Sequence, residues 1–295
     1  MPIQRKTVLV VLAFIAIYFI WGSTYLLNKI AVEEIPPLYL GGIRFIIAGI
    51  IIFIIAKISG HKLAITNAQF MNALIAGFLF LTYGNGVFVW SLKFIDSGFA
   101  ALIASSQPLM VILLMWMIDG KKIKKMSMTG VLLGITGIYL LVSQNTLVSQ
   151  EGSTIGIIMI FTTILSWSFA SIFVSKANLP SNFFVNSGYQ MILGGLLMLI
   201  FSLLIGEKWS SPVSWTDTVQ FSMVILIIFG SIVAFTSFNY LLKVVSTEKV
   251  ATSAYVNPVI ALFLGWYILD EIITIQSIIA AIVLLLGVYF INSNK

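Results

Sequence analysis

Two prolines, each preceded by an amide residue, carry the strongest chemical signal in the sequence. Gln107-Pro108 and Asn257-Pro258 lie 150 positions apart, each inside a long apolar run. A proline inside a helix removes one backbone hydrogen bond and frees the carbonyl four residues earlier. In lipid, such a carbonyl needs a partner in the protein or in a water-filled cavity. The pair therefore predicts two facing helix breaks that offer donors and acceptors to a small polar ligand, with ordinary kinked helices as the alternative.

One charged residue, Arg44, lies well inside an apolar run. A charge at that depth costs at least about 2.5–3.5 kcal/mol on membrane-insertion scales, so ionisable residues there usually serve a function. The sequence leaves two roles open. Arg44 either neutralises an anionic group of a substrate, or it has a structural role or a role in gating. The residue 146 positions later, Gln190, is polar but neutral.

Tryptophans and small hydroxyl residues form two stripes at helical spacing. Trp21 and Thr24 share one helix face, and Trp167 and Ser171 share the corresponding face in the second half of the chain. We expect the two tryptophans to form apolar walls above and below a substrate, with interhelical packing as the alternative. The remaining candidate substrate-binding residues are Tyr83, Asn85, Asn239 and Tyr255.

The composition excludes most other classes of protein. Among 295 residues, 60% are hydrophobic and only 9% are charged, against roughly 25% charged in a soluble domain. The chain has one histidine and no cysteine, so we expect neither a metal site nor a cofactor. No carboxylate, histidine or cysteine falls inside an apolar run, so we do not expect an enzyme. The basic residues lie in short loops, so no nucleic-acid partner is expected either.

The apolar runs predict an all-α integral membrane protein. A spanning helix needs about 20 mostly apolar residues. Lysines and arginines number twelve in one set of alternate loops and three in the other, which predicts a multi-pass cell-membrane protein with both termini cytoplasmic and basic loops against lipid headgroups. The ten expected spans are 7–27, 38–57, 70–92, 98–118, 128–145, 154–175, 183–205, 219–242, 249–269 and 275–292.

The second half of the chain repeats the first at a nearly constant offset. Trp21 corresponds to Trp167, and Pro108 corresponds to Pro258. Each half holds five expected spans, an odd number, so the second half would enter the membrane from the opposite face. The sequence therefore predicts two inverted five-helix repeats, 1–146 and 147–295, with a substrate site at their interface near the middle of the bilayer.

Several segments resemble the EamA-type members of the drug/metabolite transporter superfamily. They are Phe-Ile-Trp-Gly-Ser-Thr (19–24), Pro-Pro-Leu-Tyr-Leu-Gly-Gly-Ile-Arg-Phe (36–45), Ala-Leu-Ile-Ala-Ser-Ser-Gln-Pro (101–108), Ala-Thr-Ser-Ala-Tyr-Val-Asn-Pro (251–258) and Leu-Asp-Glu (269–271). The chain departs from the family pattern at 119–121, where Asp-Gly-Lys replaces a Gly-Glu pair. The resemblance implies a ten-helix exporter or permease of small organic metabolites, with a cavity contributed by spans 1, 3, 4, 6, 8 and 9.

The function expected from these features is secondary transport, without ATP, by alternating access. The expected substrates are small organic metabolites such as amino acids or related compounds, moved outward. A channel or a receptor-like helical bundle without carrier activity is the alternative. Gly130 and Gly134 form a Gly-x-x-x-Gly pair, a spacing typical of close helix packing within a chain or in a homodimer.

Overall fold

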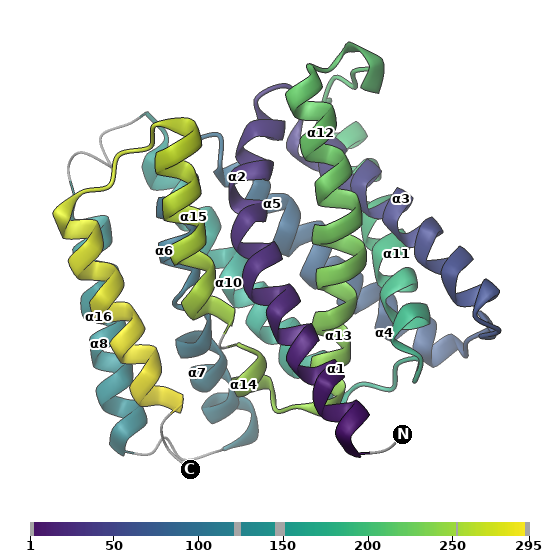
Figure 1. Cartoon of the computed structure of the whole chain (residues 1–295), viewed down its shortest axis with the longest axis horizontal. Coiled ribbons are helices and arrows are strands. Elements are labelled where there is room, and N and C mark those ends of the chain that lie inside the picture. Colours follow the sequence, from purple (N-terminus) through teal and green to yellow (C-terminus); the bar gives the residue numbers. More distant parts are fainter. Residues whose placement is uncertain (1–2, 121–124, 145–150, 252, 293–295) are drawn as a thin grey trace.

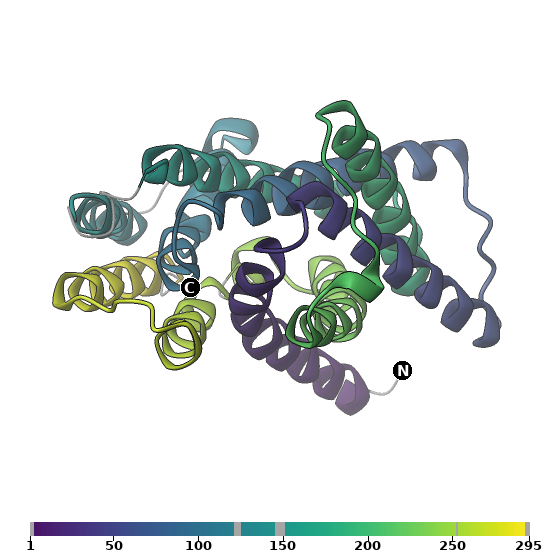
Figure 2. The same cartoon turned by 90° about the horizontal axis from the view of Figure 1, so that it is seen from above.

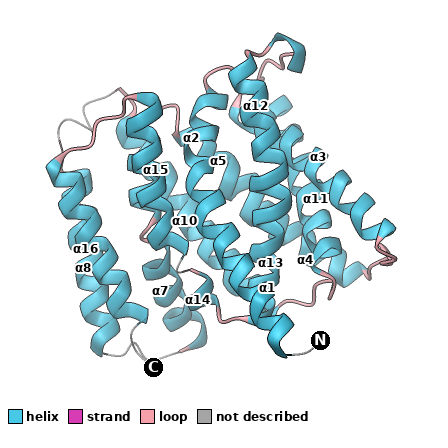
Figure 3. Cartoon of the chain, viewed as in Figure 1, coloured by secondary structure: helices cyan, strands magenta, loops and turns pink. Residues whose placement is uncertain are grey.

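The computed structural model describes residues 3–120, 125–144, 151–251 and 253–292. These residues form helices, turns and loops and contain no strand (Figure 3). Helices are expected in lipid because each backbone N–H and C=O finds its partner within the segment. The described helices, in chain order, are α1 (Ile3–Ile15), η1 (Ala16–Ile20), α2 (Trp21–Val32), α3 (Pro37–Ile58), α4 (Asn67–Gly77), η2 (Phe78–Asn85), α5 (Gly86–Ser91), α6 (Ser97–Ala104), α7 (Gln107–Asp119), α8 (Lys125–Val142), α10 (Ser153–Lys176), α11 (Phe183–Leu204), η3 (Pro212–Ser214), α12 (Asp217–Ile225), η4 (Leu226–Phe235), α13 (Thr236–Val244), α14 (Thr247–Val250), α15 (Ser253–Leu269) and α16 (Ile275–Asn292) (Figure 1).

Helical stretches long and apolar enough to cross a membrane account for most of the described chain. Seven meet both criteria: Thr7–Val32, Pro37–Ile58, Asn67–Ser91, Ser97–Ile118, Ser153–Lys176, Phe183–Leu204 and Asp217–Val244. Three shorter apolar helices follow the same pattern: Met128–Val142, Val256–Leu269 and Ile275–Gly287. The all-helical membrane fold is therefore confirmed for the described residues. Ten complete crossings, with the second half inverted, remain a prediction.

Two long helix pairs flank the centre of the bundle. Helix α3 packs along α11, and α8 packs along α16 (Figures 1 and 2). Glycines allow the close approach: a Cβ on Gly195 would lie 3.0 Å from the carbonyl oxygen of Gly42, and a Cβ on Gly287 would lie 2.8 Å from that of Gly130. The glycine pair at 130 and 134 is thus used between α8 and α16 within one chain, and it gives no support to a homodimer.

Wide π-helical turns interrupt the central helices. Segments η1, η2 and η4 lie within the first, third and eighth expected spans. Such turns shift the backbone hydrogen bonds and often occur at functional sites. Side chains from neighbouring spans pair with carbonyls in or beside these turns. Ser166 Oγ donates to Leu79 O at 2.7 Å, and Trp21 Nε1 donates to Gly230 O at 3.2 Å. The central helices are therefore held together by side chain to backbone contacts.

Carboxylates tie several helix ends at one end of the bundle. Glu271 accepts hydrogen bonds from the first two N–H groups of α6, at 2.7 and 2.8 Å. Glu207 accepts from the second and third residues of α3, at 3.1 and 2.9 Å. Glu34 accepts from both the backbone N–H and the hydroxyl of Thr216, directly before α12. A negative charge at a helix N-terminus is stabilising, so each contact fixes a loop to a helix from another part of the chain.

Candidate functional site

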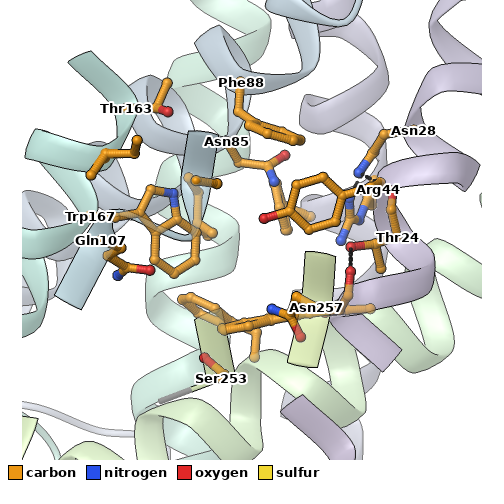
Figure 4. A pocket seen from close by; sticks show the side chains of 18 residues that line it. Thr24, Asn28, Arg44, Asn85, Phe88, Gln107, Thr163, Trp167, Ser253 and Asn257 are labelled. Atoms are coloured by element: carbon orange, nitrogen blue, oxygen red, sulfur yellow. Dashed lines mark hydrogen bonds between the residues drawn. The ribbon is translucent and has the colours of Figure 1, made fainter. Parts of the chain in front are cut away.

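A cavity of about 100 Å³ lies at the centre of the bundle (Figure 4). Its wall comes from α2, α3, η2, α5, α6, α7, α10, η4 and α15, so both halves of the chain contribute. Seven of the candidate residues line it: Trp21, Thr24, Arg44, Asn85, Gln107, Trp167 and Asn257. Amides, hydroxyls, one guanidinium and several aromatic rings therefore surround a single space, as expected for the binding site of a small organic molecule.

Arg44 lies on one side of this cavity with only neutral partners. Its side chain is 3% exposed, its Nε donates to Ser231 Oγ at 2.8 Å, and its Nη1 donates to Asn28 Oδ1 at 3.2 Å. The guanidinium carbon lies 4.8 Å from the centroid of the Phe45 ring. No ion pair joins Arg44 to a carboxylate in the part of the chain that the structure describes. We call Asn28, Arg44 and Ser231 the Arg44 cluster.

The Arg44 cluster leaves most of the guanidinium donors unused. A guanidinium has five N–H groups, and two of them take part in the hydrogen bonds to Ser231 and Asn28. Gly230 provides the room for this side chain, because a Cβ there would lie 2.9 Å from Arg44 Nη2. A buried cation beside a cavity, with three donors left over, is suited to bind an anionic group.

Asn85 points into the same cavity (Figure 4). Its Oδ1 is buried and has no hydrogen-bond partner among the described residues. Buried side-chain polar atoms are paired in the large majority of cases, so an unpaired amide calls for an explanation. Its position at the end of η2, facing the Arg44 side of the cavity, makes Asn85 a second polar contact for a bound molecule.

The fourth expected span is divided directly before Pro108. Helix α6 ends at Ala104 and α7 begins at Gln107, with Pro108 as its second residue. The hydroxyls of Ser105 and Ser106 donate to the carbonyls of Leu102 and Ile103, at 2.6 and 2.8 Å. Part of the backbone at the end of α6 is thereby satisfied within the protein. Gln107 faces the cavity from the start of α7.

The expected helix break at Pro258 is wrong. Pro258 lies inside α15, which begins at Ser253, and the described turn that precedes this helix is at Ala251. Pro258 is the sixth residue of α15, so it removes one hydrogen bond near the start of the helix, and the helix tolerates that loss.

Asn257 links two spans as well as lining the cavity. With its amide nitrogen turned toward the neighbouring carbonyls, Asn257 donates to Tyr18 O at 2.7 Å and to Ile17 O at 3.2 Å, both within η1. The amide therefore satisfies carbonyls at a π-helical turn of another span. The interaction explains why an amide stands beside Pro258 without assigning it to a substrate.

The two tryptophans form one wall of the cavity rather than two. The ring centroids of Trp21 and Trp167 are 5.5 Å apart in an edge-on arrangement, so no substrate fits between them. Phe238 packs 4.9 Å from Trp21, and Phe80 packs 4.7 Å from Trp167. The expectation of walls above and below a substrate is therefore wrong, because aromatic rings from several spans attract each other and gather on one side. Arg44 and Trp167 lie on opposite sides of the cavity (Figure 4).

Tyr83 and Ser171 do not line the cavity. Tyr83 is 37% exposed, with its ring 6.5 Å from that of Phe78. Ser171 donates to the carbonyl of Trp167 in its own helix at 2.7 Å. Thr24 also bonds its own helix, donating to Trp21 O at 2.8 Å, but it does line the cavity. The side chain of Tyr255 lies outside the described residues.

Asn239 belongs to a separate buried group, which we call the Gln190 cluster: Asn186, Ser187, Gln190 and Asn239. Gln190 Nε2 donates to Asn186 Oδ1 at 2.9 Å, and Asn186 Nδ2 donates to Asn239 Oδ1 at 3.3 Å. Asn239 Nδ2 donates to Gln190 Oε1 and to Ser187 Oγ, both at 3.2 Å. Every member is at most 1% exposed, and none lines the central cavity. The cluster joins α11 to α13.

Asn28 and Ser231 were missing from the expected site. Asn28 follows Thr24 at helical spacing on the same stripe, which was its signal in the sequence. Ser231 gave no signal, because its pairing with Arg44 depends on how η4 packs against α3. The π-helical turns were also missed, since no proline marks any of the three segments.

The comparisons with known proteins agree with this architecture. The model of the EamA-like transporter family matches residues 8–143 and again residues 154–293. The chain is 34% identical, over 96% of its length and 90% of the relative's, to the "Uncharacterized inner membrane transporter YedA" of Escherichia coli (strain K12). It is 26% identical, over 92% and 90%, to the "Probable amino-acid metabolite efflux pump" of the same organism.

The comparison extends to another bacterium and to a solved structure. The "Uncharacterized transporter YoaV" of Bacillus subtilis (strain 168) is 24% identical over 95% of both chains. One solved structure, described only as the crystal structure of a protein, aligns with a TM-score of 0.72 over 96% of both chains at 18% identity, which shows the shared fold alone. Two matches to one family model, together covering nearly the whole sequence, identify the chain as a member of the EamA-like transporter family.

Proposed function

We propose that this protein is a secondary transporter of the cell membrane that carries small organic metabolites, such as amino acids or related compounds, by alternating access through the central cavity. The observation that carries the proposal is the cavity itself, which both halves of the chain line and which contains a buried cation with no anionic partner among the described residues. The printed name of one relative, an amino-acid metabolite efflux pump, supports both the substrate class and the outward direction.

The inverted-repeat architecture, with repeats 1–146 and 147–295 and ten spans, is part of the proposal. Helix contacts support it: α3 pairs with α11, α8 with α16 and α6 with α15, and each pair joins equivalent spans of the two halves. The contact of α10 with η2 likewise has its counterpart in that of α2 with η4. A twofold axis in the membrane plane would generate this set of pairs. The two separate family matches support the same division.

Both termini are proposed to lie in the cytoplasm. The first turn of α1 and the last turn of α16 lie at the same end of the bundle (Figure 1). The excess of basic residues in the loops of that side supports the assignment. Alkaline phosphatase fused to the carboxy terminus should be inactive and a fluorescent protein fused there should be bright; an active phosphatase would reverse the assignment.

Counterflow tests the transport proposal directly. Purified protein in liposomes preloaded with an unlabelled amino-acid mixture should accumulate each labelled amino acid that it carries transiently, because an alternating carrier exchanges substrate across the membrane. Liposomes without protein are the control. Labelled substrate that equilibrates without a transient overshoot would favour the channel alternative, and no protein-dependent uptake of any small metabolite would favour a receptor-like bundle. The family is one of transporters, so we assign no catalytic step.

A further inference from the structure

We propose that the central cavity binds small organic carboxylates, with the carboxylate held by Arg44 and a second polar contact supplied by Asn85. The inference rests on the proposed transport function, since it names the substrate class of the same cavity. It goes further in assigning the charge of the substrate and the two residues that recognise it.

The charge of Arg44 requires a reason. Removing a cation from water costs several kcal/mol unless an anion or a full set of hydrogen bonds compensates. Its two described hydrogen-bond partners are the neutral side chains of Ser231 and Asn28, and the ring of Phe45 adds a weak attraction. A purely structural role needs no charge at this position, because the equivalent residue Gln190 joins two helices with a neutral amide.

The geometry leaves the guanidinium available on its cavity side. Ser231 takes Nε and Asn28 takes one N–H of Nη1, so the remaining three N–H groups are not used by described residues. A carboxylate binds a guanidinium through two parallel N–H···O bonds, which needs two such donors. The cavity is therefore suited to a carboxylate, and a ligand with a net positive charge and no carboxylate would be repelled.

Asn85 supplies an independent observation. Its amide points into the cavity, and its Oδ1 atom has no hydrogen-bond partner among the described residues. A side-chain amide both donates and accepts, and its final torsion is soft. It can therefore pair with a polar group next to the carboxylate of a bound molecule. The ring of Trp167, which lines the cavity across from Arg44, contacts the apolar remainder.

Matched compound pairs test the inference without any assay of transport. The probes are leucine with leucinamide, phenylalanine with phenylalaninamide, and 4-methylpentanoate with 4-methylpentanamide, each titrated against the detergent-purified full chain in a thermal-shift assay. A ligand that binds the folded state raises the unfolding temperature. At least one carboxylate should stabilise the protein, at a concentration at least about tenfold below that of its amide, because charge-assisted hydrogen bonds are the strongest kind. Equal responses within every pair, or no response to any carboxylate, would overturn the inference.

Variants then assign the recognition to residues. Arg44→Gln should abolish the preference for the carboxylate member of each pair. Arg44→Lys should retain part of the preference, because lysine keeps the charge but cannot form the two parallel hydrogen bonds of a guanidinium to a carboxylate. Asn85→Leu should weaken carboxylate binding by about threefold to tenfold while leaving the preference intact. Ser171→Ala is the matched control, since that hydroxyl bonds its own helix. An Arg44→Gln protein that still prefers the carboxylate would overturn the assignment.

The two proposals fail in different ways. If the wild-type protein prefers carboxylates in the thermal-shift assay and no labelled carboxylate shows counterflow, the transport proposal is wrong and the binding assignment stands. If counterflow occurs only with compounds that lack a carboxylate, the transport proposal stands and the carboxylate assignment is wrong. Should Arg44→Gln fail to fold, the wild-type compound pairs and Asn85→Leu still decide the question.

Discussion

Arg44 and Gln190 stand at equivalent positions in the two halves of the chain, but their surroundings differ. In the Gln190 cluster every amide nitrogen donates to a neighbour and every amide oxygen accepts from one, and we call the group closed because no nitrogen or oxygen of its three amides lacks a partner. In the Arg44 cluster two bonds are made and three guanidinium donors remain. The Gln190 cluster lies away from the central cavity, whereas Arg44 lies on its wall.

The difference separates polar groups that hold helices together from polar groups whose unpaired donors are available to bind a ligand. A fully satisfied buried network stabilises a fold, and a partly satisfied one costs free energy until a ligand supplies the missing hydrogen bonds.

A second pair of equivalent positions shows the same asymmetry. Asp96 precedes α6 and Ser246 precedes α14, 150 positions later, so again the ionisable residue lies in the first half. At both pairs of positions related by the offset between the halves, the ionisable residue therefore lies in the first half.

The largest effect, on the fraction of folded protein, is expected from placing a charge in the Gln190 cluster. Gln190→Arg puts a guanidinium where the side chain is fully buried and lies away from the cavity. Burying it should cost at least about 2.5–3.5 kcal/mol, so most of the protein should fail to fold. Size-exclusion profiles of a fluorescent fusion measure the folded fraction, with Gln190→Met as the size control. A normal profile for Gln190→Arg would show that the cluster has room or hidden partners.

The next largest effect, on carboxylate affinity, is expected from placing an anion beside Arg44 within the Arg44 cluster. Asn28→Asp keeps the shape of the side chain and places a carboxylate 3.2 Å from Arg44 Nη1. This internal anion should compete with substrate and weaken carboxylate binding by about tenfold or more. No gain in stability is expected, because the variant also loses the hydrogen bond from Asn28 Nδ2 to Thr24 O at 2.8 Å. Asn28→Ala, which adds no charge, is the control. Unchanged carboxylate affinity in Asn28→Asp would mean that substrate does not meet Arg44.

An intermediate effect, on the free energy of unfolding, is expected from removing one amide of the Gln190 cluster. Asn239→Leu removes the acceptor for Asn186 and the donor to Gln190 and Ser187, which leaves buried polar groups unpaired. The free energy of unfolding should fall by about 1–2 kcal/mol, since hydrogen bonds between membrane helices are individually modest. Substrate affinity should be unchanged, because Asn239 does not line the cavity. Thermal unfolding and ligand titration of the same preparation separate the two effects, and weaker binding without lost stability would contradict the comparison.

Much of this comparison could be read from the sequence. A run of apolar residues around Arg44 is enough to single out its charge, and the offset between halves identifies Gln190 as its counterpart. The pairing of amides with prolines also led to Gln107 and Asn257, both of which line the cavity. These residues could be singled out because each inference rests on a residue type that is costly or disruptive in a membrane helix, whatever its neighbours, and their contact with a substrate stays a prediction.

Other features depend on neighbours and could not be predicted. Asn85 and Asn239 are both amides inside apolar runs, and only the packing decides that the first faces the cavity and the second a closed network. Trp21 and Trp167 were correctly paired, yet their rings meet each other because α2 and α10 approach closely at that level. Pro258 is tolerated inside α15, whereas Pro108 begins a new helix after two serines that bond backward along the chain.

The smallest effect is expected at the second pair of equivalent positions, Asp96 and Ser246. Burial raises the pKa of the Asp96 carboxyl, the negative charge of Glu271 raises it further, and Lys29 opposes both. Glu271, rather than Asp96, accepts the first N–H groups of α6, so Asp96 lacks the hydrogen bonds that would favour its ionised form. In the folded protein, the ionised carboxylate at this position is therefore a destabilising group.

The sign of the pH dependence follows from that shift. A carboxyl whose pKa is raised on folding contributes stability that is fully present below its unfolded pKa and is lost as the pH rises through its folded pKa. Replacing Asp96 by the residue of the other half, Asp96→Ser, should thus stabilise the protein at pH 7 and make no difference near pH 4. We expect less than about 1 kcal/mol, since a partly exposed charge interacts weakly. Thermal unfolding of both proteins between pH 4 and pH 8 measures the difference.

Glu34→Gln is the control of opposite sign. Hydrogen bonds from Thr216 lower the pKa of Glu34, so the stability that the Glu34 carboxylate contributes is lost as the pH falls. A wild-type protein that is more stable than Asp96→Ser at pH 7, and that loses this advantage as the pH falls, would show that the charge at position 96 serves the fold. The two halves would then differ in charge for structural reasons alone.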